Sequence, residues 1–134
     1  SEEYLDISDF YVENGQIYIL DQYSMKVLVL NEDGAYNRNI NITDYWANNL
    51  FVIGGNIFLM NNNSEAVAGK YRLFEIDSVG TCLAKYIPFN VNFGFSSMEN
   101  NYSTLGKNVM FCQSPMNVIY EVAENNCRPY MQID

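Results

Sequence analysis

The chain repeats itself at an interval of 46 residues. In three segments an alternation of apolar and polar residues ends in a cluster of turn formers, and Leu28, Phe74 and Tyr120 hold equivalent places, 46 residues apart each time. Alternation with a period of two is typical of a half-buried strand, and the turn formers indicate that each strand enters a hairpin. A fixed internal period is a strong constraint on the fold, because each repeat must then be one supersecondary unit.

A second hairpin precedes each of these segments. In the first copy Asn14-Gly15 separates two apolar stretches, and Asn-Gly favours the type I′ turn because both central residues need positive φ. Gly54-Gly55 and the stretch 106–108 hold the corresponding place in the other two copies. A fourth strand is predicted after each third strand, over residues 35–42, 82–89 and 128–133.

Each unit is therefore four short antiparallel strands in about 45 residues, which is the size of a β-propeller blade. We place the blades at residues 8–42, 49–89 and 101–134 of a single propeller-type domain that spans residues 1–134. The fold class is all-β, with three blades making about half of a closed ring. A β-sandwich is the alternative, since short strands at regular spacing also suit it, but the recurrence of both turns in register favours the propeller.

The segment 6–21, DISDFYVENGQIYILD, followed by 26–34, KVLVLNEDG, resembles the six-bladed β-propeller proteins of Bacteroides-type bacteria, distant relatives of the NHL-repeat propellers. The segments 117–122 and 129–134 resemble a later blade of the same family. The resemblance implies an exported lipoprotein of the cell envelope, in the periplasm or at the cell surface, and it brings no catalytic motif. Three blades instead of six imply either a longer chain or a homodimer of three plus three blades.

The composition excludes several classes of binding partner and cofactor. The net charge is −9, with seven Lys and Arg residues, so the chain repels phosphate backbones and we expect no nucleic-acid partner. No apolar stretch approaches the ~20 residues of a membrane span, and the acidic start at residues 1–3 lacks the features of a secretory signal. The three cysteines have no zinc spacing, and the chain has no His. We therefore expect no cofactor and no metal.

Ligands are expected at the end of the blades where the longer loops lie, because unequal loops on one face commonly build binding sites. These loops are residues 22–25, 41–49, 61–70, 90–100 and 113–116. Aromatic rings that stack on sugars, flanked by amides that bond hydroxyls, are typical of glycan sites. The candidate ligand-binding residues are Tyr23, Tyr45, Trp46, Asn48, Asn49 and Asn62. Two alternatives stay open: Trp46 fills the wedge between the first two blades, and the Asn run at 61–63 is only a turn-rich loop.

Two functions from different classes follow. The first is a non-catalytic binding or scaffold module of the cell envelope, with a glycan, a peptide or a protein as its ligand. The second is a fragment of a metal-dependent propeller hydrolase or lyase, whose metal would be held by oxygen ligands because His is absent. The sequence has no G-x-S-x-G motif and no His to act as the base of a catalytic triad, so the binding module is the leading interpretation.

Overall fold

The structure is a computed structural model that describes residues 6–62, 70–89, 100–113 and 116–133. In these ranges the chain forms twelve strands in three antiparallel sheets of four, each sheet with its strands in sequence order. The first sheet contains β1 (Asp9–Glu13), β2 (Gln16–Asp21), β3 (Lys26–Asn31) and β4 (Tyr36–Asn41). The second contains β5 (Asn49–Ile53), β6 (Asn56–Met60), β7 (Tyr71–Ile76) and β8 (Cys82–Pro88). The third contains β9 (Asn100–Leu105), β10 (Asn108–Gln113), β11 (Val118–Ala123) and β12 (Asn126–Gln132).

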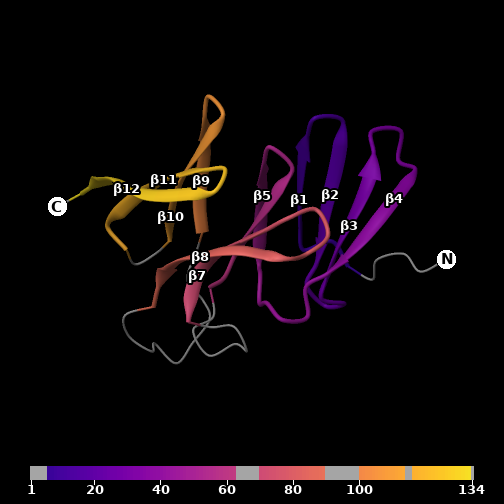
Figure 1. Cartoon of the computed structure of the whole chain (residues 1–134), viewed down its shortest axis with the longest axis horizontal. Helices are drawn as coiled ribbons and strands as arrows, with labels where there is room; N and C mark the ends of the chain where they lie inside the picture. The colour runs from indigo at the N-terminus through magenta and orange to yellow at the C-terminus, as the bar shows by residue number, and fades with distance from the viewer. Residues whose placement is uncertain (1–5, 63–69, 90–99, 114–115, 134) are drawn as a thin grey trace.

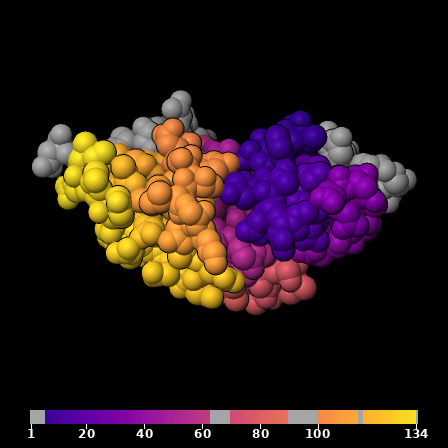
Figure 2. Space-filling model, turned by 90° about the horizontal axis from the view of Figure 1, so that it is seen from above, coloured from indigo at the N-terminus to yellow at the C-terminus, as the bar shows by residue number. Residues whose placement is uncertain are grey.

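The sheets follow one another around an arc. Figure 2 shows the first sheet, indigo to purple, at one end and the third, orange to yellow, at the other. The first and third sheets lie on opposite sides of Figure 1. No helix of the described chain has the length and apolar content that a membrane crossing requires. The all-β prediction and the partial propeller are confirmed.

The predicted register of the repeat is confirmed by strand pairing. Leu28 lies opposite Ile19 in the first sheet. Phe74 lies opposite Leu59, and Tyr120 lies opposite Phe111. The three residues thus occupy the same place in the third strand of each sheet, and equivalent positions can be compared from blade to blade throughout the chain.

The hairpin turns follow the chemistry of their residues. Asn14 and Gly15 have φ of 53° and 77°, and Gly54 and Gly55 have φ of 60° and 87°. These positive values at both central positions are those that the type I′ turn needs. In the third sheet Gly106 has φ of 61°, while Lys107 has no positive φ, which is the pattern of a type II′ turn with Gly at its first central position.

The middle sheet is buried on both faces. Leu50, Leu59 and Phe74 pack toward the first sheet, beside Tyr18 and other apolar residues of that sheet. Residues of the opposite parity pack toward the third sheet, and the rings of Phe51 and Phe58 stack with centroids 5.0 Å apart. A sheet covered on both faces needs continuous apolar runs rather than alternation, which explains the stretch Ile57–Met60 of β6.

Candidate functional site

Each sheet has a buried polar residue where its second strand ends. Asp21, Asn61 and Gln113 hold this equivalent position, and all three are fully buried. Buried polar groups need hydrogen-bond partners. Asp21 accepts the backbone N–H of Ser24 at 3.0 Å, and Asn61 donates from Nδ2 to the carbonyl of Tyr71 at 2.8 Å. In the first two blades this residue therefore holds the loop between the second and third strands.

Gln113 bonds to the second blade as well as within its own sheet. Its Nε2 donates to the carbonyl of Asn61 at 2.8 Å and to Oδ1 of Asn100 at 2.7 Å. Its Oε1 accepts from Nη1 of Arg72, a buried arginine of β7, and burial lowers the pKa of Arg72. One glutamine thus ties the end of the third blade to the backbone and to a side chain of the second.

These contacts continue to the first blade. Nδ2 of Asn100 donates to Oδ1 of Asn48 at 2.9 Å and to Oδ1 of Asn49 at 3.0 Å. Asn49 donates from Nδ2 to Oδ2 of Asp9 at 3.1 Å, and the backbone N–H of Leu50 reaches the same oxygen at 3.0 Å. We call this set the amide network; its residues are Asp9, Asn48, Asn49, Asn100 and Gln113. It joins the starts of β1, β5 and β9, the first strands of the three blades.

The structure brings two of the predicted ligand residues together in the loops beside the amide network. Trp46 and Asn62 are half-buried, and the indole N–H of Trp46 donates to Oδ1 of Asn62 at 3.1 Å. Asn48 and Asn49 also meet, since Nδ2 of Asn48 donates to Oδ1 of Asn49 at 3.0 Å. Both amides belong to the amide network, so a ligand that used them would share them with bonds between blades.

The other two predicted residues lie in different surroundings. The ring of Tyr45 packs on Phe74, with centroids 5.2 Å apart, at the edge of the core between the first two blades. Burial, with the neighbouring Cys82 thiol, raises the pKa of Tyr45 to about 12. Tyr45 and the buried Ala47, rather than Trp46, pack against that core. Tyr23 is 80% exposed in the β2–β3 loop.

The comparisons with known proteins agree with this geometry. The profile of a protein family described as "6-bladed beta-propeller" matches residues 1–134. The chain belongs to this family. Comparison with curated proteins gave no match.

Solved structures similar to this propeller chain are themselves longer. A protein from Bacteroides fragilis that is assigned as exported has 19% identity and a TM-score of 0.78, over 97% of this chain and 38% of that one. BamB from Moraxella catarrhalis has 13% identity and a TM-score of 0.63, over 95% and 36%. A streptogramin B lyase has 15% identity and a TM-score of 0.55, over 91% and 39%. At these identities the likeness shows the fold, and the chain spans less than half the length of each.

A cleft of about 960 Å³ lies at the opposite end of the propeller blades, among the hairpin turns. Its lining includes Glu13, Lys107 and Glu124. The Glu13 carboxylate accepts the backbone N–H groups of Gly54 and Gly55 at 2.9 and 3.1 Å, which fastens the first hairpin to the second. Among residues 6–62, 70–89, 100–113 and 116–133, no three His, Cys, Asp or Glu side chains gather in a way that could hold a metal ion.

Sequence reasoning placed Asn100 and Gln113 in the predicted loops without naming them as site residues, and it missed Asp9. For Gln113 a signal was present, because a polar residue follows the apolar second strand in every copy of the repeat. Parts of the predicted loop face, residues 63–69, 90–99 and 114–115, lie outside the described residues. The described residues of the loop face include several amides and one indole, groups that bond and stack with polar, uncharged ligands.

Proposed function

We propose that this propeller chain is a non-catalytic binding module of the cell envelope that takes a glycan at its loop end. The observation on which the proposal rests is the pair Trp46–Asn62. The hydrogen bond at 3.1 Å fixes the orientation of the only tryptophan, and the ring stays half-buried rather than enclosed in the core. An indole held in this way can present its remaining surface to a sugar ring at a small cost in side-chain entropy.

The surrounding chemistry supports a glycan over other ligands. Amides predominate in the amide network beside Trp46, and amides both donate to and accept from hydroxyl groups. The net charge of −9 disfavours an anionic ligand. The envelope location is supported by the similar Bacteroides fragilis protein, which is assigned as exported. A glycan of the envelope or of its surroundings is the ligand class that fits these observations.

The test is a glycan array followed by calorimetry on the best binder. Trp46→Ala should weaken binding at least 10-fold with the fold unchanged by circular dichroism, because stacking on an aromatic ring is lost. Trp46→Phe keeps part of the ring surface and loses the bond to Asn62, so an intermediate loss is expected. Tyr36→Ala is the matched control, since Tyr36 is 61% exposed on β4, away from the loops. Equal affinity of Trp46→Ala and the unaltered chain would exclude this site.

The absence of catalysis is part of the proposal and has its own test. Calorimetric titration with Ca²⁺ and Mg²⁺, followed by assays on lactone and ester substrates with and without the metal, addresses the hydrolase or lyase alternative. We expect no metal-dependent turnover. Turnover that requires a bound cation would replace the binding module with an enzyme.

A further inference from the structure

The hydrogen bonds of the amide network run in one direction from blade to blade. At one end the guanidinium of Arg72 donates to Oε1 of Gln113, and Nε2 of Gln113 donates to Oδ1 of Asn100 at 2.7 Å. Nδ2 of Asn100 donates to Oδ1 of Asn49 at 3.0 Å, and Nδ2 of Asn49 donates to Oδ2 of Asp9 at 3.1 Å. Each amide along this path therefore accepts on the arginine side and donates on the aspartate side.

The two ends of the path dictate its direction. A guanidinium has donors and no acceptor, whereas a carboxylate has acceptors and no donor. Arg72 is buried, and its guanidinium carbon lies 4.3 Å from the ring centroid of Phe89, a contact that holds the cation in place. Oδ2 of Asp9 also accepts the backbone N–H of Leu50 at 3.0 Å, which holds the carboxylate. An amide that turned over would exchange its donor and its acceptor, so the charged ends keep the amides between them in one orientation.

Gln113 holds the segment that carries Asn62. Its Nε2 also donates to the backbone carbonyl of Asn61 at 2.8 Å, and this carbonyl belongs to the peptide group that joins Asn61 to Asn62. The backbone N–H of Asn61 in turn donates to the carbonyl of Arg72 at 2.8 Å. Gln113 and Asn61 are both fully buried. A residue of the third blade therefore positions Asn62, the hydrogen-bond partner of the Trp46 indole.

Asn48 holds the segment that carries Trp46, two residues before it. Its backbone N–H donates to the carbonyl of Met60 at 3.0 Å, which joins this segment to the second strand of the second blade. Its side chain is a branch of the network with the same direction, because Oδ1 accepts from Asn100 at 2.9 Å and Nδ2 donates to Asn49 at 3.0 Å. Both partners of the indole hydrogen bond therefore lie close to residues that the third blade holds through the network.

We propose that Asp9 and Arg72 are positioning residues that fix the direction of the amide network, and that the network in this direction holds the indole of Trp46 in place. Both residues act through the amides between them, without contact to a ligand. The consequence for binding rests on the proposed function, because it requires that the loop end takes a glycan. The effect on Trp46 itself needs no ligand.

A network with a direction can be reversed, and separate hydrogen bonds cannot. Asn100→Asp replaces the donor that serves Asn48 and Asn49 with a carboxylate oxygen, so that acceptors face acceptors. The two amides can turn over in response, but Oδ1 of Asn49 then faces the carboxylate of Asp9. Asp9→Asn removes this conflict, because an asparagine can donate from Nδ2 to the turned amide and accept from Leu50 with Oδ1. The double variant thus moves the carboxylate from the first blade to the third.

The experiment is acrylamide quenching of the fluorescence of the single tryptophan, in the folded chain without ligand. Asn100→Asp should raise the quenching of Trp46 about two-fold, because the segment before β5 loses its anchor on the third blade. Asp9→Asn alone should change the quenching little, since its amide oxygen replaces the acceptor. The double variant Asp9→Asn/Asn100→Asp should recover most of the difference, and it should also recover most of the loss in the urea midpoint of unfolding.

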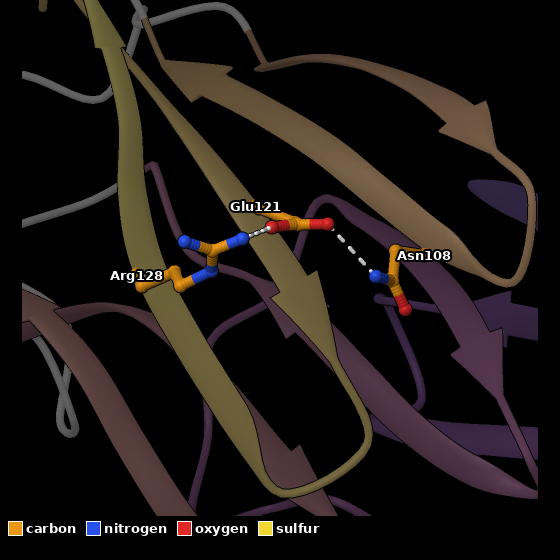
Figure 3. A network of polar contacts seen from close by, with 3 residues as sticks. All are labelled: Asn108, Glu121 and Arg128. Carbon is orange, nitrogen blue, oxygen red and sulfur yellow. Dashed lines mark hydrogen bonds and ion pairs between the residues drawn. The ribbon is translucent and has the colours of Figure 1, made fainter.

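Asn108→Asp is the matched control, because it is the same substitution in the same sheet at the hairpin end. Figure 3 shows that Asn108 donates to Glu121, which also accepts from Arg128. One carboxylate lies between two donors there, so this set has no direction to reverse, and its residues belong to one sheet. Asn108→Asp should leave the quenching of Trp46 unchanged, and its loss of stability should add to that of Asp9→Asn.

The double variant distinguishes a directed network from separate hydrogen bonds. Recovery supports the proposal, because residues of the first and third blades then compensate each other through Asn49. Additive losses would overturn it, as would equal quenching in Asn100→Asp and Asn108→Asp. Circular dichroism shows which variants are folded. If Asn100→Asp alone does not fold, folding of the double variant is itself the recovery, and its failure to fold would overturn the proposal.

Glycan affinity is measured last. Asn100→Asp should weaken binding about 10-fold, as expected for the loss of one or two hydrogen bonds that hold the site, and the double variant should restore it. Unchanged affinity of Asn100→Asp, with binding abolished by Trp46→Ala, would overturn the positioning role. Recovery of the fluorescence in a chain that binds no glycan would refute the proposed function and leave the directed network standing.

Discussion

At the residue scale, Cys127 shows how the contact between blades controls the chemistry of a single group. Cys127 packs against the core between the second and third sheets. Burial, with a smaller contribution from the charge of Glu75, raises the pKa of the Cys127 thiol from 9.0 to about 12. The thiolate is the reactive species, so the thiol should be poorly reactive near neutral pH although its side chain is half-buried rather than fully enclosed.

We therefore predict slow alkylation of Cys127 in the folded chain. A rise of this size lowers the thiolate fraction roughly 1,000-fold at pH 8, so iodoacetamide should modify Cys127 at least 10-fold more slowly in buffer than in urea, as followed by peptide mass spectrometry. Because the folded pKa is raised, the neutral thiol stabilises the fold fully below pH 9, and that stability is lost as pH rises toward 12. Equal rates in buffer and in urea would contradict the prediction.

The limits of sequence reasoning are also clearest for single residues. Tyr45 and Trp46 are neighbours in the connection before β5, where no strand period says which ring turns inward; the structure turns Tyr45 onto Phe74 and bonds Trp46 to Asn62. The residue type of Asn48 and Asn49 predicts contacts with a ligand. Their bonds to Asn100 and Asp9 depend on how neighbouring blades are placed, which a repeat within one blade does not encode.

At the element scale, most of the blade could be predicted. The third strands lie where the alternation of apolar and polar residues predicts them, and Asn14-Gly15 forms the expected turn with positive φ at both residues. Their burial does not alternate: β7 is buried from Arg72 to Ile76, because neighbouring sheets cover both of its faces. What could not be predicted is the side chain that reaches from one sheet into the turn of the next. In the sequence, Glu75 occupies a polar position of the alternating pattern, which predicts an exposed side chain. In the structure it is fully buried. Its carboxylate accepts the backbone N–H of Asn125 from another sheet.

Glu75→Gln tests that contact between the second and third sheets. The amide that replaces the carboxylate has one acceptor oxygen and adds an NH₂ donor where three donors already point. A buried polar group without a proper partner costs about 1–3 kcal/mol, so the free energy of unfolding in urea should fall by about that amount. The substitution also removes a charge that raises the pKa of Cys127, and alkylation of that thiol should become faster.

The matched control for Glu75→Gln is Glu32→Gln, the same substitution at an exposed residue of the β3–β4 turn. The surface substitution should change the free energy of unfolding by no more than about 0.5 kcal/mol. If the two variants unfolded at the same urea concentration, the carboxylate of Glu75 would have no special role in holding the third sheet.

At the scale of the whole molecule, polar contacts join all three sheets at the loop end and the first two sheets at the hairpin end. The amide network joins the loop ends of β1, β5 and β9, and Glu13 fastens the hairpin ends of the first two blades through the N–H groups of Gly54 and Gly55. Two apolar cores fill the space between the sheets. These polar contacts and the two apolar cores together set the relative placement of the blades.

The net negative charge affects the stability of the molecule as a whole. The chain has 16 acidic and seven basic side chains and no His, so its net charge of −9 should hardly change between pH 6 and 8. Like charges destabilise the compact state through mutual repulsion, and salt screens that repulsion over a Debye length of ≈ 10 Å at 0.1 M. We expect the melting temperature to rise by a few degrees from about 10 mM to about 200 mM NaCl, at a single chain concentration.

Sucrose at matched osmolality controls for general exclusion effects. A melting temperature that falls with salt would mean that attractive ion pairs, such as Glu121 with Arg128, outweigh the net repulsion.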